Sequence, residues 1–171
     1  MPRLVRVDLR LERWLSDDIP WLPAGEVPAT ALRDLDAKGN ELSFFEVGAG
    51  IDIERIVVAV VAKRQDPTRT DVGYSIFELQ EEGARAMGIT VAKSPGETPD
   101  AGVNALHYNV EHLTARKVAD LARVISGGTI DSVLPKRIAD VLQRGLRDGT
   151  LDGGQLDRKV LAKIGWAPAP P

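Results

Sequence analysis

The order of strand-like and helix-like patterns along the chain is the feature that most constrains its fold. Short runs typical of strands, alternating or apolar, occur only before residue 93, at 4–12, 42–47, 72–77 and 89–92. From residue 98 onward, apolar side chains recur at the spacing of amphipathic helices. Strands gathered early and helices gathered late are typical of the α+β class.

We therefore predict an α+β fold with a small four-stranded sheet, mixed or antiparallel, followed by an all-helical C-terminal half. Residues 1–97 form the sheet portion, and residues 98–165 form a helical portion that packs on it within one domain. Residues 166–171 form a disordered proline-rich tail, because its prolines cannot donate to a sheet or continue a helix.

The segment 53–64 is predicted to be a helix that crosses between strands 42–47 and 72–77 and covers one face of the sheet. Its apolar residues fall at helical spacing: Ile53, Ile56, Val57, Val60 and Val61. All five are β-branched, which makes them a poor intrinsic choice for a helix. Packing against the rest of the protein must therefore hold this segment helical.

Composition narrows the classes of function. The 171 residues include no cysteine, which excludes disulfides, thiolate metal sites and a cysteine nucleophile. The start, MPRLVRVDLRLERW, lacks the apolar core of a signal peptide, and the longest apolar run, Ile56 to Ala62, is too short to cross a membrane. We expect a cytoplasmic protein without a membrane partner.

The net charge of −3 is distributed unevenly along the chain. Residues 1–106 hold 12 basic and 18 acidic side chains, whereas residues 107–171 hold 10 basic and 7 acidic ones. This basic half raises nucleic-acid binding through the C-terminal helices as an alternative function. Acidic residues are interleaved with the basic ones, and no stacking aromatics lie between them, which argues against a nucleic-acid partner.

The stretch FFEVGAGID, from Phe44 to Asp52, joins a predicted strand to a predicted helix through Gly48 and Gly50. Its EVGAG resembles the first motif of methyltransferases. The resemblance implies an enzyme that binds S-adenosylmethionine or a nucleotide at this turn. Asp52 stands where the next glycine would be, and the chain after Val91 offers no further strands for a doubly wound sheet. We favour a tight corner in which Asp52 caps the helix, with no cofactor.

Two histidines, His107 and His112, lie in a segment predicted to be helical. Their i, i+5 spacing would place the imidazoles about 140° apart, unlike the i, i+4 pairs that bind zinc on a helix. His107 would lie beside Glu111, and His112 would face solvent. No serine lies in a nucleophile elbow. We predict no metal ligand and no catalytic residue, which favours a protein that is not an enzyme.

The segment ERWLSDDIPWLPAGEVP combines tryptophan, acidic residues and proline. Trp14 and Trp21 are costly to leave in water, while Asp17 and Asp18 are costly to bury within a monomer. A basic surface of another protein would satisfy both demands. We therefore predict a non-catalytic adaptor that binds a protein partner, or a second copy of itself, through these four residues. In the alternative arrangement, both indoles fold back onto the sheet and close the core.

Overall fold

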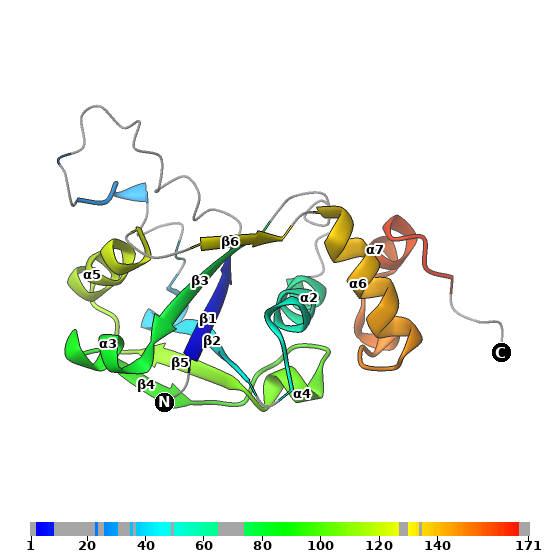
Figure 1. Cartoon of the computed structure of the whole chain (residues 1–171), viewed down its shortest axis with the longest axis horizontal. Helices are drawn as coiled ribbons and strands as arrows, with labels where there is room; N and C mark the ends of the chain where they lie inside the picture. Colours follow the sequence, from blue (N-terminus) through cyan, green and yellow to red (C-terminus); the bar gives the residue numbers. More distant parts are fainter. Residues whose placement is uncertain are drawn as a thin grey trace.

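The computed structural model describes residues 3–8, 23, 26–30, 35, 37–48, 50–64, 74–126, 130–133 and 135–167. These residues form a six-stranded sheet with helices on both of its faces (Figure 1). In chain order the elements are β1 (Arg3–Asp8), η2 (Lys38–Asn40), β2 (Leu42–Val47), α2 (Ile53–Arg64), β3 (Tyr74–Gln80), α3 (Glu81–Ala86), β4 (Thr90–Lys93), α4 (Ala101–Asn104), β5 (His107–Glu111), α5 (Ala115–Ser126), β6 (Ile130–Val133), α6 (Pro135–Arg147), η4 (Gly153–Gln155) and α7 (Arg158–Lys163).

The described strands lie in the order β4-β5-β2-β1-β3-β6, and each neighbouring pair is antiparallel. β2 and β3 both pair with β1, so they run parallel to each other with β1 between them. α2 joins these two strands and is the predicted crossover helix. The α+β class is therefore confirmed.

Alternating strand side chains divide the core into two layers, one on each face of the sheet. One layer gathers Leu4, Phe44 and Phe77 with residues of α3 and α5. The other layer gathers Val5 and Phe45 with residues of α2 and α6. Figure 1 shows the same division, with α2, α6 and α7 on one side of the sheet and α3 and α5 on the other.

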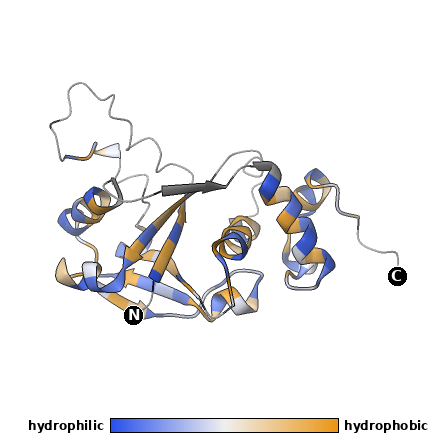
Figure 2. Ribbon diagram, in the orientation of Figure 1, coloured by the Kyte–Doolittle hydropathy of each residue, from blue (hydrophilic) through white to orange (hydrophobic). Residues whose placement is uncertain are grey.

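The sheet and α6 cover the α2 helix, which explains why most of its side chains are apolar. Ile56, Val57 and Ala59 are fully buried, and Val58 and Val61 are each 3% exposed. Figure 2 shows α2 as mostly apolar, whereas α5 and α6 carry hydrophilic residues on their outer sides. A helix buried on most of its surface needs little intrinsic helix propensity, since packing supplies the stability.

The finer prediction, four strands and an all-helical C-terminal half, matches the structure only roughly: the four predicted strands are present as β1 to β4, but two further strands follow them. β5 lies inside the segment predicted to be helical, and it occupies an interior position between β4 and β2. β6 adds a further strand at the β3 edge. Only α4, with four residues, is helical between residues 98 and 113. A short apolar run does not distinguish strand from helix, and here the pairing of β5 with two neighbours decides.

The sheet consequently draws on both halves of the chain instead of ending at residue 97. The remaining helical predictions for the second half hold in α5, α6 and α7. The first strand is described as Arg3–Asp8, so that its predicted continuation through residue 12 lies outside the described residues. Residues 168–171 of the predicted tail also lie outside them.

Candidate functional site

The four residues predicted to bind a partner, Trp14, Asp17, Asp18 and Trp21, lie outside the described residues. Their role stays a prediction. In the described part of the chain, the candidates are the glycine turn, the histidines, the C-terminal helices and the surface at the end of β4.

The glycine turn is a closed corner. Gly48 and Gly50 have φ angles of 138° and 83°, which residues with a Cβ rarely adopt. The amide of Gly48 donates to the carbonyl of Ile51 at 3.4 Å, and the amide of Ile51 donates back to Gly48 at 3.1 Å. Asp52 Oδ1 accepts from the amide of Arg55 at 2.8 Å, so the predicted helix cap is confirmed.

The prediction that the chain after Val91 offers no further strands is wrong, because β5 and β6 follow. The strand directions nevertheless differ from those of a dinucleotide site. Dinucleotide sites lie beyond the carboxyl ends of neighbouring parallel strands, where the strand order reverses. Every neighbouring pair of described strands is antiparallel, and the exposed Asp52 carboxylate occupies the helix N-terminus that would receive a phosphate.

The histidines lie on and beside a strand, which corrects the predicted helical pairing of His107 with Glu111. His107 is 7% exposed, and its Nδ1–H donates to the carbonyl of Ser94 at 3.1 Å. Its ring meets Phe45 edge-on, with the ring centroids 5.1 Å apart. His112 is exposed, as predicted, with a φ of 55°.

The surroundings of His107 keep its imidazole neutral. Burial lowers the pKa of His107 below 6.5, and although the hydrogen bond to Ser94 opposes this shift, the charge of Lys63 adds to it. The charge of Glu97 raises the pKa of His107 and so opposes the effect of Lys63. Ser94 contacts His107 through its backbone carbonyl, not through its hydroxyl, so these two residues do not form a nucleophile and its base.

The connection between β4 and β5, residues 94–106, is held by a side chain that reaches across it. Asn104 Oδ1 accepts from both the amide and the hydroxyl of Thr98, each at 2.7 Å, and Asn104 Nδ2 donates to the carbonyl of Thr98 at 2.8 Å. The amide of Gly96 donates to the carbonyl of Asn104 at 3.1 Å. A Cβ at Gly96 would lie 2.8 Å from Asn104 Cα, so only glycine fits at this approach.

Asp100 ties the same connection to α2. Its carboxylate is almost fully buried and accepts from Arg55 Nε at 2.6 Å and from Arg55 Nη2 at 2.9 Å. It also caps α4 by accepting from the amides of Gly102 and Val103. Burial alone would raise the pKa of Asp100, but the hydrogen bonds from Arg55 and the two amides outweigh it, and the pKa is lowered. These contacts give Asp100 a structural role.

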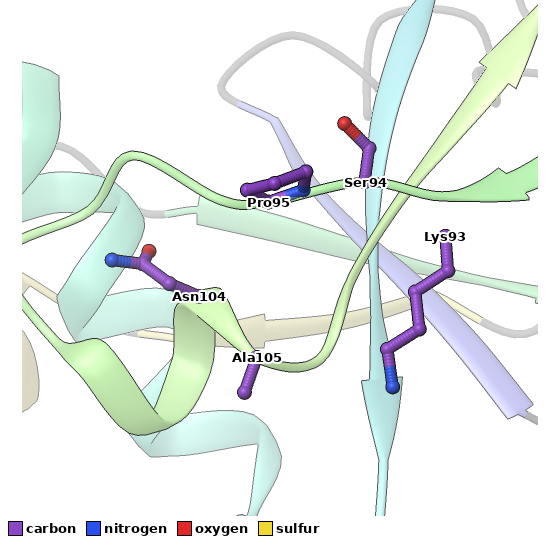
Figure 3. A pocket seen from close by; sticks show the side chains of 5 residues that line it. All are labelled: Lys93, Ser94, Pro95, Asn104 and Ala105. Atoms are coloured by element: carbon purple, nitrogen blue, oxygen red, sulfur yellow. The ribbon is translucent and has the colours of Figure 1, made fainter.

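A pocket of about 390 Å³ lies beside this connection, at the end of β4. Lys93, Ser94 and Pro95 line it from one segment, and Asn104 and Ala105 line it from the other (Figure 3). Its walls are mostly apolar, and Pro95 and Ala105 are exposed. Since the hydrogen bonds of Asn104 hold both segments, the pocket is preformed.

Lys93 places a positive charge at the rim of this pocket. Its Nζ lies 5.8 Å from the centroid of the Tyr108 ring, and the hydroxyl of Tyr108 donates to Glu46 at 3.1 Å. Lys93 makes no ion pair with any described residue, whereas Lys63 pairs with Glu97 at 3.2 Å. The rim therefore has a cation that no carboxylate of the described chain neutralises.

The basic residues of the C-terminal helices are partly neutralised. Arg123 pairs with Asp120 on α5, and Arg137 of α6 pairs with Glu54 of α2. These pairs agree with the interleaving of charges in the sequence, and the surface they form is mixed in sign.

The described ranges contain no group of three or more His, Cys, Asp or Glu that could hold a metal ion. They also contain no helix with the length and apolar character needed to cross a membrane.

No protein-family model matches this chain, and no curated protein or solved structure matches it. The pocket was not predicted from the sequence, because Asn104 and Ala105 were assigned to a long helix. The signal that could have indicated it is Ser94-Pro95-Gly96, which marks a turn after a short strand.

Proposed function

We propose that the chain is a non-catalytic protein-interaction module whose pocket at the end of β4 receives an apolar side chain from another protein. The preformed character of the pocket is the observation that carries this proposal. The amide of Gly96, next to Pro95, donates to the carbonyl of Asn104, and the side chain of Asn104 makes three hydrogen bonds to Thr98, so that binding need not order the connection. A site that is already ordered loses less conformational entropy when a partner binds.

The chemistry of the walls favours a side chain over a polar metabolite. Sites for small molecules usually combine an apolar surface with several convergent polar groups. Here the amide of Asn104 is already engaged by Thr98, and Pro95 and Ala105 supply apolar surface. One rim charge, that of Lys93, remains for orientation.

The acidic tryptophan segment remains part of the proposal as a second contact surface, through Trp14, Asp17, Asp18 and Trp21. A second copy of this chain is the alternative partner for that segment. The enzyme hypothesis at Gly48 and Gly50 has less support, because the amides of Gly48 and Ile51 bond to each other's carbonyls and the amide of Arg55 donates to Asp52.

Selection from a library of random 12-residue peptides tests the pocket. Peptides enriched on the wild-type protein should share an apolar position, and Ala105→Trp, which fills the pocket, should weaken their binding at least tenfold. Ala115→Trp places the same bulk at an exposed position at the start of α5 and should leave binding unchanged. Circular dichroism would check that both variants are folded. Peptides that bind both variants as well as the wild type would refute the pocket as the site.

A further inference from the structure

We propose that the bound segment adds to the outer edge of β4 as an extra strand and carries an acidic residue that pairs with Lys93. This inference rests on the proposed function and names the chemistry of its partner: a short, extended, acidic segment of another protein. Backbone pairing along a sheet edge, with a pocket for a side chain, is a known mode of peptide recognition.

Backbone geometry determines which groups of β4 are available at the edge. The amide of Ser94 donates to the carbonyl of His107 at 3.1 Å, and Ala92 lies opposite Asn109 in the same register. In an antiparallel ladder, alternate residues point their amide and carbonyl toward the same neighbour. The backbone amides and carbonyls of Thr90, Ala92 and Ser94 therefore point toward β5. Those of Val91 and Lys93 point outward, away from the sheet.

Among the described strands, β4 is the terminal one on its side of the sheet, as Figure 1 also shows, so no described strand lies beside these outward groups. Val91 and Lys93 each offer one donor and one acceptor, so an added strand can form up to four backbone hydrogen bonds. The pocket lies directly after Lys93 along the chain, which places it within reach of the same added segment.

The flanks limit how much chain can pair. The amide of Ile89 already donates to the carbonyl of Ala84 at 3.0 Å, and Pro95 has no amide hydrogen. A short edge strand with lysine and proline is also a common protection against indiscriminate pairing between sheets. A backbone ladder this short gives little affinity by itself, so a productive partner needs side-chain contacts as well.

Charge complementarity supplies those contacts. Lys93 is exposed, lies on the same face as Tyr108, and makes no ion pair within the described chain. Opposite charges on directly facing strand residues stabilise their pairing. A carboxylate on the added strand would meet Lys93, and a neighbouring apolar side chain would enter the pocket between Pro95 and Ala105.

The experiment uses the tightest peptide from the selection, made synthetically, with its affinity measured by titration against the full chain. Methylation of single peptide amides should weaken binding at alternate positions only, because a strand donates from every second residue. Lys93→Glu should weaken binding at least tenfold and Lys93→Gln about threefold. Exchange of the acidic peptide residue for lysine should restore binding to Lys93→Glu.

Lys159→Glu is the matched control, since it makes the same charge change on the exposed surface of α7 and should not alter the affinity. If Ala105→Trp abolishes binding but neither the alternation nor the Lys93 effect is found, this inference is overturned and the pocket stands. If no peptide is selected, both proposals fail. If the protein sediments as a dimer that Lys93→Glu dissociates, a second copy occupies the edge and the inference is likewise overturned.

Discussion

Two connections next to α2 are held in different ways. At the glycine turn, Gly48, Gly50 and Asp52 are exposed, and local features fix the turn: the φ angles of Gly48 and Gly50 and the cap by Asp52. The connection at 94–106 is partly buried and is fixed by long-range contacts. Asp100 reaches Arg55, which is 45 positions away, and His107 holds Ser94, which is 13 positions away.

The two connections should therefore differ in how much folding stability a single substitution removes. A locally determined turn should lose little when one residue changes, because each contribution is small and solvent replaces lost partners. A connection held by buried polar groups should lose much more, because those groups would be left without partners. It also supplies four of the five residues that line the proposed binding pocket, so its rigidity matters for binding.

The largest effect is expected at Asp100. Asp100→Ala leaves the Arg55 guanidinium without its partner and uncaps α4, which should lower the free energy of unfolding by about 3 kcal/mol. The figure is at the low end for buried pairs, since Arg55 is 36% exposed and solvent can hydrate it. Denaturant titration measures the change. Asp100→Asn keeps a capping oxygen but not the charge, and should therefore lose less. Equal losses would show that the ion pair with Arg55, and not the cap, stabilises the connection.

A smaller loss is expected at Asn104. Asn104→Ala leaves the buried amide of Thr98 without an acceptor, which should cost about 2 kcal/mol. The hydroxyl of Thr98 loses one of its two acceptors and keeps the carbonyl of Asp100 at 3.2 Å. Peptide affinity should fall as well, because the pocket wall is released. Asn109→Ala is the control, since Asn109 donates to an exposed Glu41 and should cost well under 1 kcal/mol. If Asn104→Ala and Asn109→Ala lower the free energy of unfolding equally, the buried hydrogen bonds of the 94–106 connection contribute no more than an exposed one.

The glycine turn should be less sensitive. Gly48→Ala and Gly50→Ala meet no atom within 4 Å, so the cost is limited to the unfavourable φ, about 1 kcal/mol each. Gly83→Ala is a useful control, because Gly83 lies in α3 with open space around it and should gain stability. Thermal unfolding with and without S-adenosylmethionine measures both effects. A stabilisation by that ligand, lost in both turn variants, would restore the enzyme hypothesis.

The smallest effect concerns pH and His107. Because burial lowers the pKa of His107 in the folded state, the unfolded chain binds more protons below pH 6.5. The stability contributed by neutral His107 is thus complete above that pH and is lost as the pH falls through the folded pKa. His107→Phe should flatten this part of the stability profile between about pH 5 and 7. A folded-state pKa above 6.5, measured by NMR, would contradict the expected sign.

The local features of this protein could be predicted from its sequence. The crossover helix α2, the cap by Asp52 and the glycine corner follow from spacing, side-chain chemistry and backbone freedom within a few residues. The amphipathic helices α5 and α6 were likewise predictable, because each repeats one apolar face over three turns. Such signals are local, and a single stretch contains all of their evidence.

The secondary structure of residues 98–113 depends instead on contacts with distant parts of the chain. Val103, Leu106, Val110 and Leu113 fit a helical stripe, yet His107–Glu111 becomes an interior strand because β4 and β2 offer hydrogen-bond partners on both sides. The ion pair of Asp100 with Arg55 likewise joins residues that are 45 positions apart, and the pocket forms where the chain returns from β4 to β5. The energy of pairing with β4 and β2 outweighs a weak local preference for helix, and this energy cannot be read from one stretch of sequence.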